Sequence, residues 1–257
     1  MKIVTWNVNS IRAREDIVLD WVEANAPDVL CLQETKITDQ EFPEDGFVDM
    51  GYEVSFYGQA SYNGVAIASR RGLGPIRKGF DEGDEEEEKR LLITEVEGTT
   101  IVDIYLPNGQ SYGGDKFRYK LGWIDQLHRM LQERLSKTER LVLCGDFNIA
   151  PLDLDHYWAP DGTPRLFTSP EERAALKKLT DLGLVDVHPK VRPNERAYTW
   201  WDYRGRGFQR DEGMRIDLFL VTPQVLQEVS DIQVDRETRS GEGPSDHAPV
   251  VLELEGQ

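Results

Sequence analysis

The chain has 257 residues, of which 39% are hydrophobic, enough to build one core of the sandwich or α/β type. Its formal net charge is −17, with 47 acidic residues against 30 basic ones, which argues against broad adhesion to nucleic acid or to an anionic membrane surface. The two cysteines, Cys31 and Cys144, lie in apolar runs, and neither a signal peptide nor an apolar stretch of about 18 residues is present, so we expect buried free thiols in a cytoplasmic protein.

Short strand-like runs dominate the first half of the chain. Residues 2–6 predict a buried strand. Apolar residues at positions 17, 18, 21 and 22 then recur at helical spacing before Pro27, which predicts a helix that ends there. A second buried strand is predicted at residues 29–32, and more strands, separated by Gly-containing turns, are predicted at 53–57, 65–69, 91–95 and 101–105.

The middle of the chain combines one long helix with an irregular segment. Apolar residues between Phe117 and Leu135 recur at helical spacing, which predicts a long amphipathic helix. Residues 141–144 predict a strand. The Pro-, Asp- and Gly-rich stretch that follows, 151–164, is typical of a binding loop or of a solvated excursion.

The last third contains a well-marked helix and two late strands. Ser169 is suited to cap a helix that has Pro170 in its first turn, and Gly183 is suited to end it. Strands are predicted at 216–221 and 250–254. Because most strands come in near-consecutive pairs with few crossover helices, the pattern predicts mixed sheets, and we expect a single domain over residues 1–257.

Charge is unevenly distributed along the chain. Residues 85–88 are four consecutive glutamates, which is typical of a solvated loop. In contrast, the aromatic segment 198–203 is flanked by arginines at positions 196, 204, 206, 210 and 215. Aromatic rings interleaved with arginine suit stacking on a sugar or base and contacts to a DNA backbone, so the basic charge is predicted to be local.

Polar side chains lie at the ends of several predicted strands, where a turn former would be usual. They are Asn7 and Asn9 after the first strand, Glu34 after the second, Asp146 and Asn148 after residues 141–144, and Asp246 and His247 before the last strand. Repeated acid and amide groups at such positions indicate a site where strand ends converge on a metal ion and a phosphate.

Hard oxygen donors of this kind suit Mg²⁺, with Mn²⁺ as an alternative. Glu34 is the best ligand, since it is a carboxylate just past a buried strand, and Asn9 and Asp246 could contribute directly or through water. Zinc is disfavoured because the four histidines, at positions 128, 156, 188 and 247, show no spacing of a tetrahedral site. The number of metal ions, one or two, stays open.

Two pairs of residues are suited to move or stabilise protons. Asp146 and Asn148 would point to the same side of an extended backbone, where a carboxylate can accept a proton from water and a carboxamide can orient that water. Asp217 lies in an apolar segment where an unpaired acid is costly, so we expect it to meet His247 and fix its tautomer. Whether Asp146 or the Asp217–His247 pair is the general base stays open. Tyr105, at a strand end before a turn, could contact a phosphate or leaving oxygen.

Together these segments resemble, along essentially the whole chain, the exonuclease III family of abasic-site (AP) endonucleases within the endonuclease/exonuclease/phosphatase superfamily. The resemblance is carried by Trp6-Asn7-Val8-Asn9, Gln33-Glu34-Thr35-Lys36, Tyr62-Asn63-Gly64, Pro107-Asn108-Gly109, Gly145-Asp146-Phe147-Asn148, Tyr198-Thr199-Trp200-Trp201-Asp202-Tyr203-Arg204, Arg215-Ile216-Asp217 and Ser245-Asp246-His247. The Tyr-Thr-Trp-Trp-Asp-Tyr-Arg and Pro-Asn-Gly segments favour the DNA-repair branch over lipid or inositol phosphatases.

The resemblance implies a fold, an activity and a partner. The fold is a four-layer α/β sandwich of two packed mixed sheets flanked by helices, with the site where the loops of both sheets meet. The activity is Mg²⁺-dependent hydrolysis 5′ to an abasic site in duplex DNA, leaving a 3′-hydroxyl, with 3′→5′ exonuclease and 3′-phosphodiesterase or phosphatase activity as additions. We expect a monomer that is associated with the nucleoid if the source is prokaryotic, and no membrane partner.

The resemblance also implies roles for individual residues. Glu34 is the metal ligand, with Asn7, Asn9 and Asp246 close by; Asp146 and Asn148 activate and orient the water; Tyr105 and His247 hold the phosphate, and Asp217 orients His247. Trp200, Met214 and Ile216 form an apolar pocket for the baseless sugar, and Asn108 and Arg204 belong to the same DNA-facing surface. Such a pocket selects damage, because a flipped nucleotide without a base costs little unstacking.

Two other functions stay open at this point. One is a phosphodiesterase or phosphatase that uses the same metal site on a small or lipid phosphate, and the other is a module that binds damaged DNA without catalysis. The chain also departs from many family members at Asp211-Glu212, where they carry Asn-Arg. That change would remove or oppose a contact with DNA.

Overall fold

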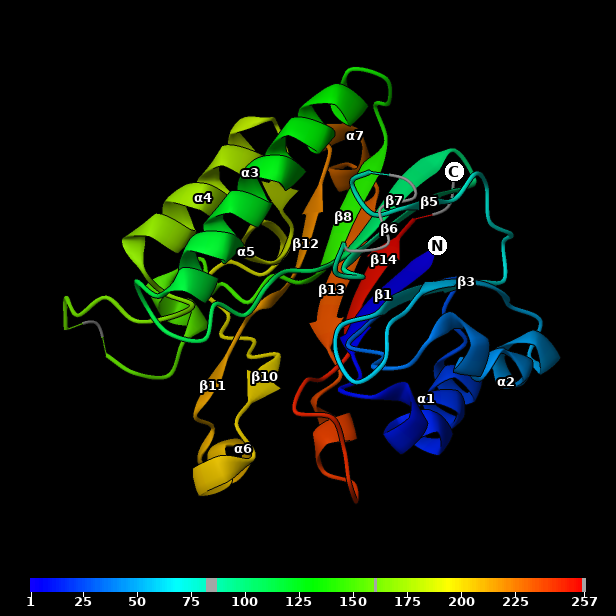
Figure 1. The fold of residues 1–257 in the computed structure, drawn as a ribbon, viewed down its shortest axis with the longest axis horizontal. Coiled ribbons are helices and arrows are strands. Elements are labelled where there is room, and N and C mark those ends of the chain that lie inside the picture. The colour runs from blue at the N-terminus through cyan, green and yellow to red at the C-terminus, as the bar shows by residue number, and fades with distance from the viewer. Residues whose placement is uncertain (82–86, 160, 256–257) are drawn as a thin grey trace.

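Two six-stranded β-sheets form the centre of the structure (Figure 1). The computed structural model describes residues 1–81, 87–159 and 161–255. The first sheet has the order β13 (Val229–Val234), β14 (Val250–Leu254), β1 (Lys2–Asn7), β2 (Val29–Gln33), β4 (Val65–Ser69), β3 (Glu53–Tyr57). The second has the order β5 (Arg77–Lys78), β6 (Leu91–Val96), β7 (Thr99–Tyr105), β8 (Leu141–Asp146), β12 (Asp217–Val221), β9 (Val185–Asp186).

Both sheets are mixed, as the sequence predicts. Strands β1 and β2 are parallel in the first sheet, and β7 and β8 are parallel in the second, while the other pairs are antiparallel. A parallel pair requires a crossover, and each crossover here is a helix: α1 (Ile11–Asn25) joins β1 to β2, and α3 (Asp115–Leu135) joins β7 to β8. The two halves of the protein therefore share one architectural plan.

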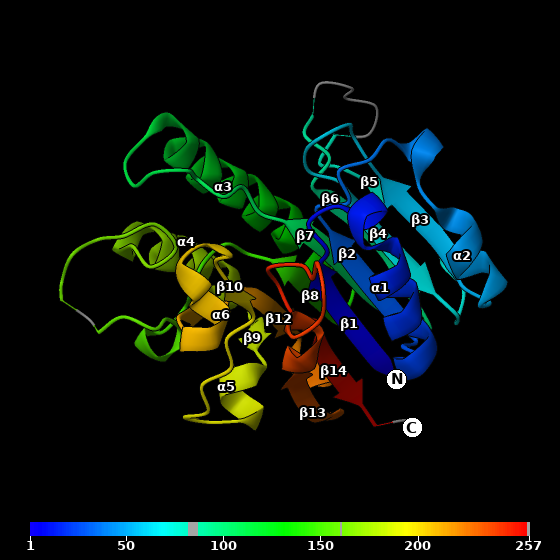
Figure 2. The ribbon, with the colours of Figure 1, turned by 90° about the horizontal axis from the view of Figure 1, so that it is seen from below.

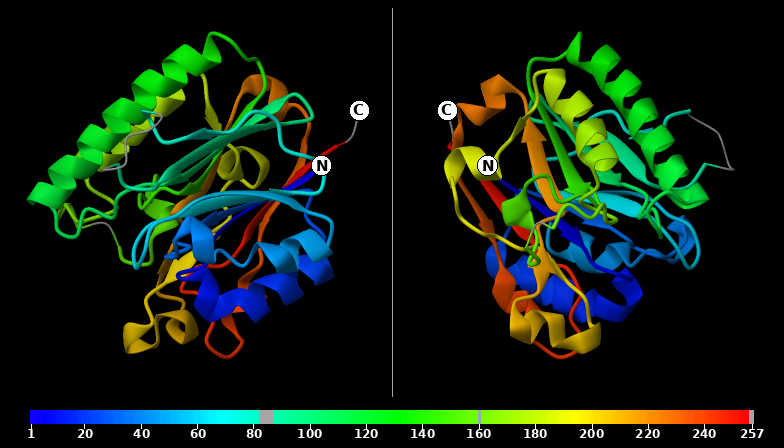
Figure 3. Two further views of the ribbon diagram at one scale, coloured as in Figure 1. Left: turned by 45° about the vertical axis from the view of Figure 1, so that its right-hand side comes forward. Right: turned by 90° about the vertical axis from the view of Figure 1, so that its left-hand side faces the viewer.

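Helices cover the outer faces of both sheets, so the protein has four layers (Figures 2 and 3). Helix α1 and α2 (Glu44–Asp49) pack on the first sheet, and α3 and α4 (Pro170–Asp181) pack on the second. Shorter elements complete the chain: the hairpin β10 (Trp200–Trp201) and β11 (Gly213–Met214), and helices α5 (His188–Val191), α6 (Gly207–Arg210) and α7 (Pro223–Leu226). The four-layer sandwich is confirmed.

The inner faces of the sheets form a core that is apolar except for one polar layer. Side chains alternate along each strand, so Ile101 of β7 faces the other sheet while Val102 faces α3. At the next inward position Asp103 is fully buried, and Gln33 Nε2 donates to its Oδ1 at 2.7 Å and to Thr5 Oγ1 at 2.9 Å. Burial raises the pKa of Asp103 well above its usual value.

Most predicted elements match the structure, and the exceptions have physical causes. The strand β13 is missed because Ile232 is its only buried residue, so the segment lacks a buried apolar run. Helix α1 begins earlier than the apolar pattern shows, at Ile11, because the Ser10 hydroxyl caps it by accepting from the amide of Ala13 at 3.4 Å. Cys31 and Cys144 are buried free thiols, as expected.

The structure describes only part of the acidic run 85–88. Residues 85 and 86 lie outside the described residues, whereas Glu88 accepts from Arg90 Nε at 2.7 Å. Within residues 1–81, 87–159 and 161–255, no helix has both the length and the apolarity that a bilayer crossing requires.

An ion pair is completely buried between the two helices that cover the second sheet. Lys120 of α3 and Glu172 of α4 are each 0% exposed and bonded to one another. Glu172 is also the third residue of a capping box, in which Ser169 Oγ accepts from its amide at 3.3 Å. Burial lowers the pKa of Lys120, and the Glu172 carboxylate opposes that effect.

Removing one partner of this pair should destabilise the protein strongly. We expect Glu172→Ala to lower the free energy of unfolding by about 3–5 kcal/mol, because it leaves the Lys120 ammonium buried without a counter-charge. The double variant Lys120→Met with Glu172→Leu should recover much of that loss. The control is Asp181→Ala, which breaks an exposed pair with Lys177 and should cost less than about 1 kcal/mol. Urea unfolding measures all three; a double variant as unstable as Glu172→Ala would contradict the expectation.

Candidate active site

Strand ends from both sheets meet at one edge of the molecule. In the parallel pairs, Asn7 lies beside Gln33, and Tyr105 lies beside Asp146, so these residues are at the carboxyl ends of their strands. Strands β12 and β14 are antiparallel to β8 and β1, so they begin where their neighbours end. Asp217, for example, is the first residue of β12 and pairs with Asp146.

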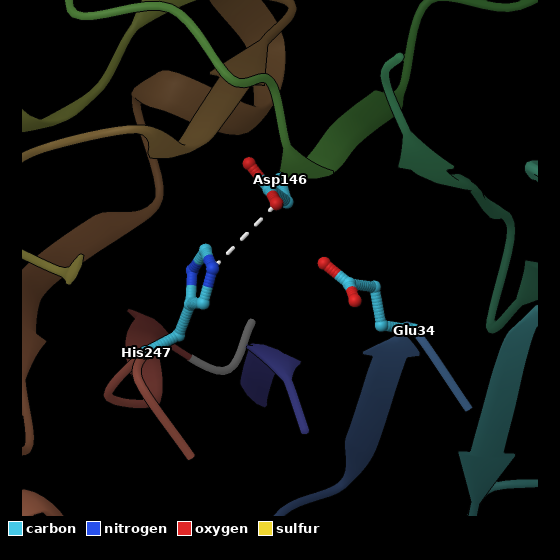
Figure 4. A group of neighbouring side chains, drawn as sticks. All are labelled: Glu34, Asp146 and His247. Atoms are coloured by element: carbon cyan, nitrogen blue, oxygen red, sulfur yellow. Dashed lines mark ion pairs between the residues drawn. The ribbon is translucent and has the colours of Figure 1, made fainter. Parts of the chain in front are cut away.

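Three ionisable side chains from different elements point into one space (Figure 4). Glu34, Asp146 and His247 each offer a ligand atom, and these atoms lie within 4.8 Å of one another. Asn7 holds two of them in place: its Nδ2 donates to Glu34 Oε1 and to Asp146 Oδ2, both at 2.9 Å. His247 Nε2 lies 3.7 Å from Asp146 Oδ2. The structure thus brings together residues from positions 7, 34, 146 and 247.

Lys36 keeps Glu34 ionised. Its Nζ lies 2.7 Å from Glu34 Oε2 and donates to Asn9 Oδ1 at 2.5 Å. Burial alone would raise the pKa of Glu34, but the Lys36 ammonium and the Asn7 amide outweigh it and hold that pKa below its usual value. A carboxylate that stays charged is what a divalent cation needs as a ligand.

Asp246 joins the site through two donors. Asn9 Nδ2 donates to Asp246 Oδ1 at 3.0 Å, and Trp200 Nε1 donates to Asp246 Oδ2 at 3.0 Å. Asn9 therefore links Asp246 to Lys36 and hence to Glu34. All four residues that the sequence assigns to a metal lie in this linked group, with Glu34 nearest to Asp146 and His247.

The donor chemistry of this group fits Mg²⁺ or Mn²⁺. It offers the carboxylates of Glu34 and Asp146, with Asp246 and amide oxygens nearby, and these are hard oxygen donors. The two cysteine thiols lie in the core between the sheets, so they supply no soft ligand here. The one imidazole in the group, that of His247, has Nδ1 already bonded to Asp217.

Asp217 fixes the orientation of the His247 ring and favours its protonated form. His247 Nδ1 lies 2.8 Å from Asp217 Oδ2, which also accepts from the Thr199 hydroxyl at 2.5 Å. Burial alone would lower the pKa of His247, but the carboxylates of Asp217 and Asp146 outweigh it and raise this pKa to about 10. The imidazole is therefore cationic at neutral pH, which suits it to face an anionic phosphate oxygen.

Asp146, in contrast to His247, is shifted toward its neutral form. Burial raises its pKa to about 7, with the Asp217 and Glu34 carboxylates adding to the rise, while the His247 imidazolium opposes it. A carboxylate with a pKa near neutrality is matched to proton transfer at physiological pH. The raised pKa suits the Asp146 carboxylate to accept a proton, whereas the imidazole of His247 is shifted toward its protonated form.

Asp146 and Asn148 lie together, but through a turn and not along an extended strand as expected. Asn148 has a φ of 49°, its amide donates to Asp146 Oδ1 at 2.8 Å, and its Nδ2 is 3.3 Å from Asp146 Oδ2. Gly145, the residue before Asp146, allows β8 to lie close to β7: its φ is 137°, and a Cβ there would lie 1.9 Å from the Ile104 carbonyl oxygen. An alanine at 145 would therefore displace the strand end that carries Asp146.

The left-handed backbone region is unusually populated around the site. Asn9, Glu34, Lys36 and Asn148 have φ values of 46°, 52°, 55° and 49°. Such conformations cost free energy in residues other than glycine, and they tend to gather where side chains must be aimed for function.

Tyr105 and Asn108 lie at the border of the site. The Tyr105 ring is buried, and burial together with the nearby carboxylates of Glu34 and Asp146 raises its pKa well above the usual value, so its hydroxyl stays protonated. The Arg90 guanidinium stacks on this ring at 4.6 Å and donates to the Tyr105 carbonyl at 3.1 Å. Asn108 Nδ2 donates to Asn148 Oδ1 at 3.3 Å.

Of the residues predicted to form an abasic pocket, Met214 and Ile216 are mostly covered, while Trp200 is partly exposed and lines a hollow of about 360 Å³ together with Met214. Met214 and Ile216 are 3% and 1% exposed, because Phe167 and Trp200 pack against them. Arg204 is different: its side chain is 93% exposed and paired with Asp202. Asp211, which was expected to remove or oppose a contact with DNA, pairs with Arg236 at 2.8 Å, so its charge is locally balanced.

Several residues of the site were not predicted from the sequence. Lys36 stands inside a recognised motif, so its neighbour Glu34 could have drawn attention to it. Arg90 and Phe167 carry no such signal, since only the folded chain places them against Tyr105 and Met214. Lys120 was not singled out in the sequence, and its Nζ donates to the Asn148 carbonyl at 2.7 Å.

Known proteins share both this sequence pattern and this fold. Residues 4–247 match the Endonuclease/Exonuclease/phosphatase family. The chain is 33% identical over 266 residues to Exodeoxyribonuclease III of Haemophilus influenzae, with 99% of this chain and 100% of that protein covered. A 3′-5′ exonuclease (NExo) from Neisseria meningitidis has a TM-score of 0.96 and 40% identity, and an AP endonuclease from Archaeoglobus fulgidus has a TM-score of 0.93 and 40% identity; both matches cover 100% of each chain.

Glu34 should determine the affinity for a divalent cation. We expect Glu34→Gln to weaken Mn²⁺ binding by at least about tenfold, because it removes the charged oxygen donor that Lys36 and Asn7 orient. Electron paramagnetic resonance of free Mn²⁺, or calorimetric titration, measures the change. Glu41→Gln is the matched control, since Glu41 is an exposed acid paired with Arg12. Equal affinities of the two variants would remove Glu34 from the metal site.

Proposed function

Because this chain belongs to the exonuclease III/AP endonuclease family of the endonuclease/exonuclease/phosphatase superfamily, we propose that it is a Mg²⁺-dependent base-excision-repair enzyme that hydrolyses DNA phosphodiesters on the 5′ side of an abasic site or of a 3′-terminal nucleotide. The chain is a phosphodiesterase hydrolase of the exodeoxyribonuclease III/AP endonuclease type. We favour DNA over a small or lipid phosphate as the substrate, because the relatives at 33–40% identity are named as a DNA exonuclease, a 3′-5′ exonuclease and an AP endonuclease.

The convergence of Glu34, Asp146 and the Asp217–His247 pair is the observation that carries the proposal. Asp146 accepts a proton from a water molecule that Asn148 helps to orient. The water oxygen forms a bond to phosphorus while the bond from phosphorus to O3′ breaks, and O3′ takes up a proton to leave a 3′-hydroxyl. The imidazolium of His247 and the hydroxyl of Tyr105 stabilise negative charge on the phosphate oxygens.

A divalent cation, when bound by Glu34 with Asn7, Asn9 and Asp246 nearby, supplies positive charge that stabilises the phosphate in the transition state. Mg²⁺ is proposed as this ion, with Mn²⁺ able to replace it. Lys36 holds Glu34 ready for the ion by keeping its pKa low. We also propose that the protein acts as a cytoplasmic monomer on duplex DNA.

Two substrates fit this chemistry, and one observation favours the second. Incision at an abasic site is supported by the match to the AP endonuclease of Archaeoglobus fulgidus. Removal of a 3′-terminal nucleotide is supported by the match to the Neisseria exonuclease and by Phe167, whose packing against Met214 and Ile216 covers the apolar surface suited to a baseless sugar. We therefore propose 3′-end processing as the stronger activity and abasic incision as the weaker one.

The substrate test compares two duplexes with the same flanking sequence. One carries an internal tetrahydrofuran abasic analogue and the other a recessed 3′ end, each with and without Mg²⁺ at low salt. We expect metal-dependent cleavage of both, faster at the 3′ end, and a loss of about 10²–10⁴-fold for both in Asp146→Asn, because the proton acceptor is gone. Wild-type protein that leaves both duplexes intact would refute the proposal, and near-normal turnover by Asp146→Asn would refute that residue's role.

The pH dependence should report the two ionised groups. Asp146 must be deprotonated, so kcat/KM should rise with pH up to its pKa of about 7, and His247 must be protonated, so the rate should fall above its pKa of about 10. A bound divalent cation favours the carboxylate and should shift the acidic limb to lower pH.

The variant His247→Ala separates the two candidates for general base. It should lose the alkaline limb and keep the acidic one, displaced to higher pH, because the imidazolium no longer stabilises the Asp146 carboxylate. pH–rate profiles at saturating Mg²⁺ measure this. Loss of the acidic limb in His247→Ala would make the histidine the base instead.

A further inference from the structure

One buried cation has no role in the steps above. The ammonium of Lys120, on helix α3, faces helix α4, and its side chain is 0% exposed. An ammonium group has three N–H donors and no acceptor. Three acceptors surround it here: the Glu172 carboxylate, the Asn148 carbonyl at 2.7 Å and the Asn108 carbonyl at 3.4 Å. One side chain therefore joins α4 to two loops at the catalytic edge.

These two loops follow the parallel strands β7 and β8. Asn108 comes after the end of β7, and Asn148 comes after the end of β8. The side chains of the loops are bonded as well: Asn108 Nδ2 donates to Asn148 Oδ1 at 3.3 Å, and Asn148 Nδ2 lies 3.3 Å from Asp146 Oδ2. One ammonium thus holds the two backbones, while the two carboxamides form a chain that ends on Asp146.

The aliphatic part of Lys120 fits closely against the first of these loops. Gly109 has a φ of 93°, and a Cβ there would lie 3.3 Å from Lys120 Cδ and 3.0 Å from Leu166 Cδ1. The ammonium lies over the Phe167 ring, with 5.2 Å between Nζ and the ring centroid. This packing, together with the bonds of the ammonium, limits movement of the loop relative to α3.

Stability alone does not account for a charge at position 120. A buried ion pair gains little over apolar side chains of similar volume, because the desolvation of both charges offsets their attraction. An apolar side chain at 120 would, however, remove the Lys120 donor from both carbonyls, and a buried polar group without a partner costs about 1–3 kcal/mol. Asn148 has a φ of 49°, a conformation that persists where surrounding contacts maintain it.

We propose that Lys120 is a positioning residue for hydrolysis, whose ammonium fixes the carboxamides of Asn108 and Asn148 relative to Asp146. Glu172 supplies the counter-charge that allows the ammonium to be buried. This inference rests on the proposed function, in which Asn148 orients the attacking water, and Lys120 acts through Asn148 instead of contacting the substrate. Misplacement of a reacting group by about 1 Å can lower a rate by about 10²-fold.

Two variants separate positioning from stability. Glu172→Gln removes the counter-charge, but Lys120 can still donate to both carbonyls, since even an uncharged amine has two N–H groups. This variant should be less stable than wild type and keep kcat within about threefold. Lys120→Met with Glu172→Gln leaves no buried charge, so it should be no less stable than Glu172→Gln. Its kcat should nevertheless fall by about 10- to 100-fold on both duplexes of the substrate test, with KM changed less than about threefold.

The control removes another ion pair between the same two helices. Lys178 of α4 and Asp125 of α3 are paired at 2.7 Å and are about half exposed, so Lys178→Met with Asp125→Asn should keep the wild-type kcat and KM. Lys120→Met with Glu172→Leu should show the same fall in kcat as the first double variant, and it replaces that test if Glu172→Gln does not fold. Wild-type kcat in both double variants at 120 and 172, or an equal fall in Glu172→Gln, would overturn the inference.

Hydrogen exchange reports the two loops independently of turnover. In Lys120→Met with Glu172→Gln, amide exchange in segments 106–111 and 147–151 should rise relative to exchange in β1 and β2, compared with Glu172→Gln. Mass spectrometry of peptic fragments measures the exchange, and unchanged relative exchange in both loops would contradict the positioning role. If wild-type protein hydrolyses neither duplex with Mg²⁺, the proposed function fails, whereas the exchange still decides whether Lys120 holds the loops.

Discussion

The carboxamide of Asn7 is the contact on which the arrangement of this protein depends. It donates at 2.9 Å to Glu34, from the first sheet, and at 2.9 Å to Asp146, from the second, so one side chain ties the two sheets together at their polar edge. The register of β1 against β2 sets where Asn7 stands, and a slip by one residue would turn it to the opposite face. The relative position of the two acids therefore follows from strand pairing and not from the loops.

Several carboxylates lie close together in the buried site, and nearby cationic side chains neutralise only part of their negative charge. Lys36 balances Glu34, and His247 stands between Asp217 and Asp146. Burial raises the pKa of Asp146, and the excess of negative charge that remains adds to this rise. The same imbalance makes the site attractive to a divalent cation, although the chain as a whole carries −17. The charge that matters for chemistry is therefore local to this site.

Local patterns in the sequence predicted most of the strands, the mixed sheets and most of the polar edge, while the four-layer arrangement was implied by the resemblance. Buried runs give strands β1, β2, β7 and β8, and a polar residue after each run gives a residue of the site. What could not be predicted depends on long-range packing: Phe167 reaches Met214 from a loop, and Lys120 meets Glu172 between two helices. The extended backbone expected at Asn148 was wrong, because its φ of 49° places it in the left-handed region, which asparagine tolerates in turns.

The left-handed backbone at Asn9, Glu34, Lys36 and Asn148 has a consequence for how the protein can change. Each position combines a chemical role with a conformation that β-branched side chains resist, so two independent constraints act on one residue. Few substitutions are tolerated at such positions, because a replacement must carry the right functional group and also adopt an unfavourable backbone torsion. The conformational penalty is met once, during folding, which leaves the ligand-binding geometry preorganised before any nucleic acid arrives.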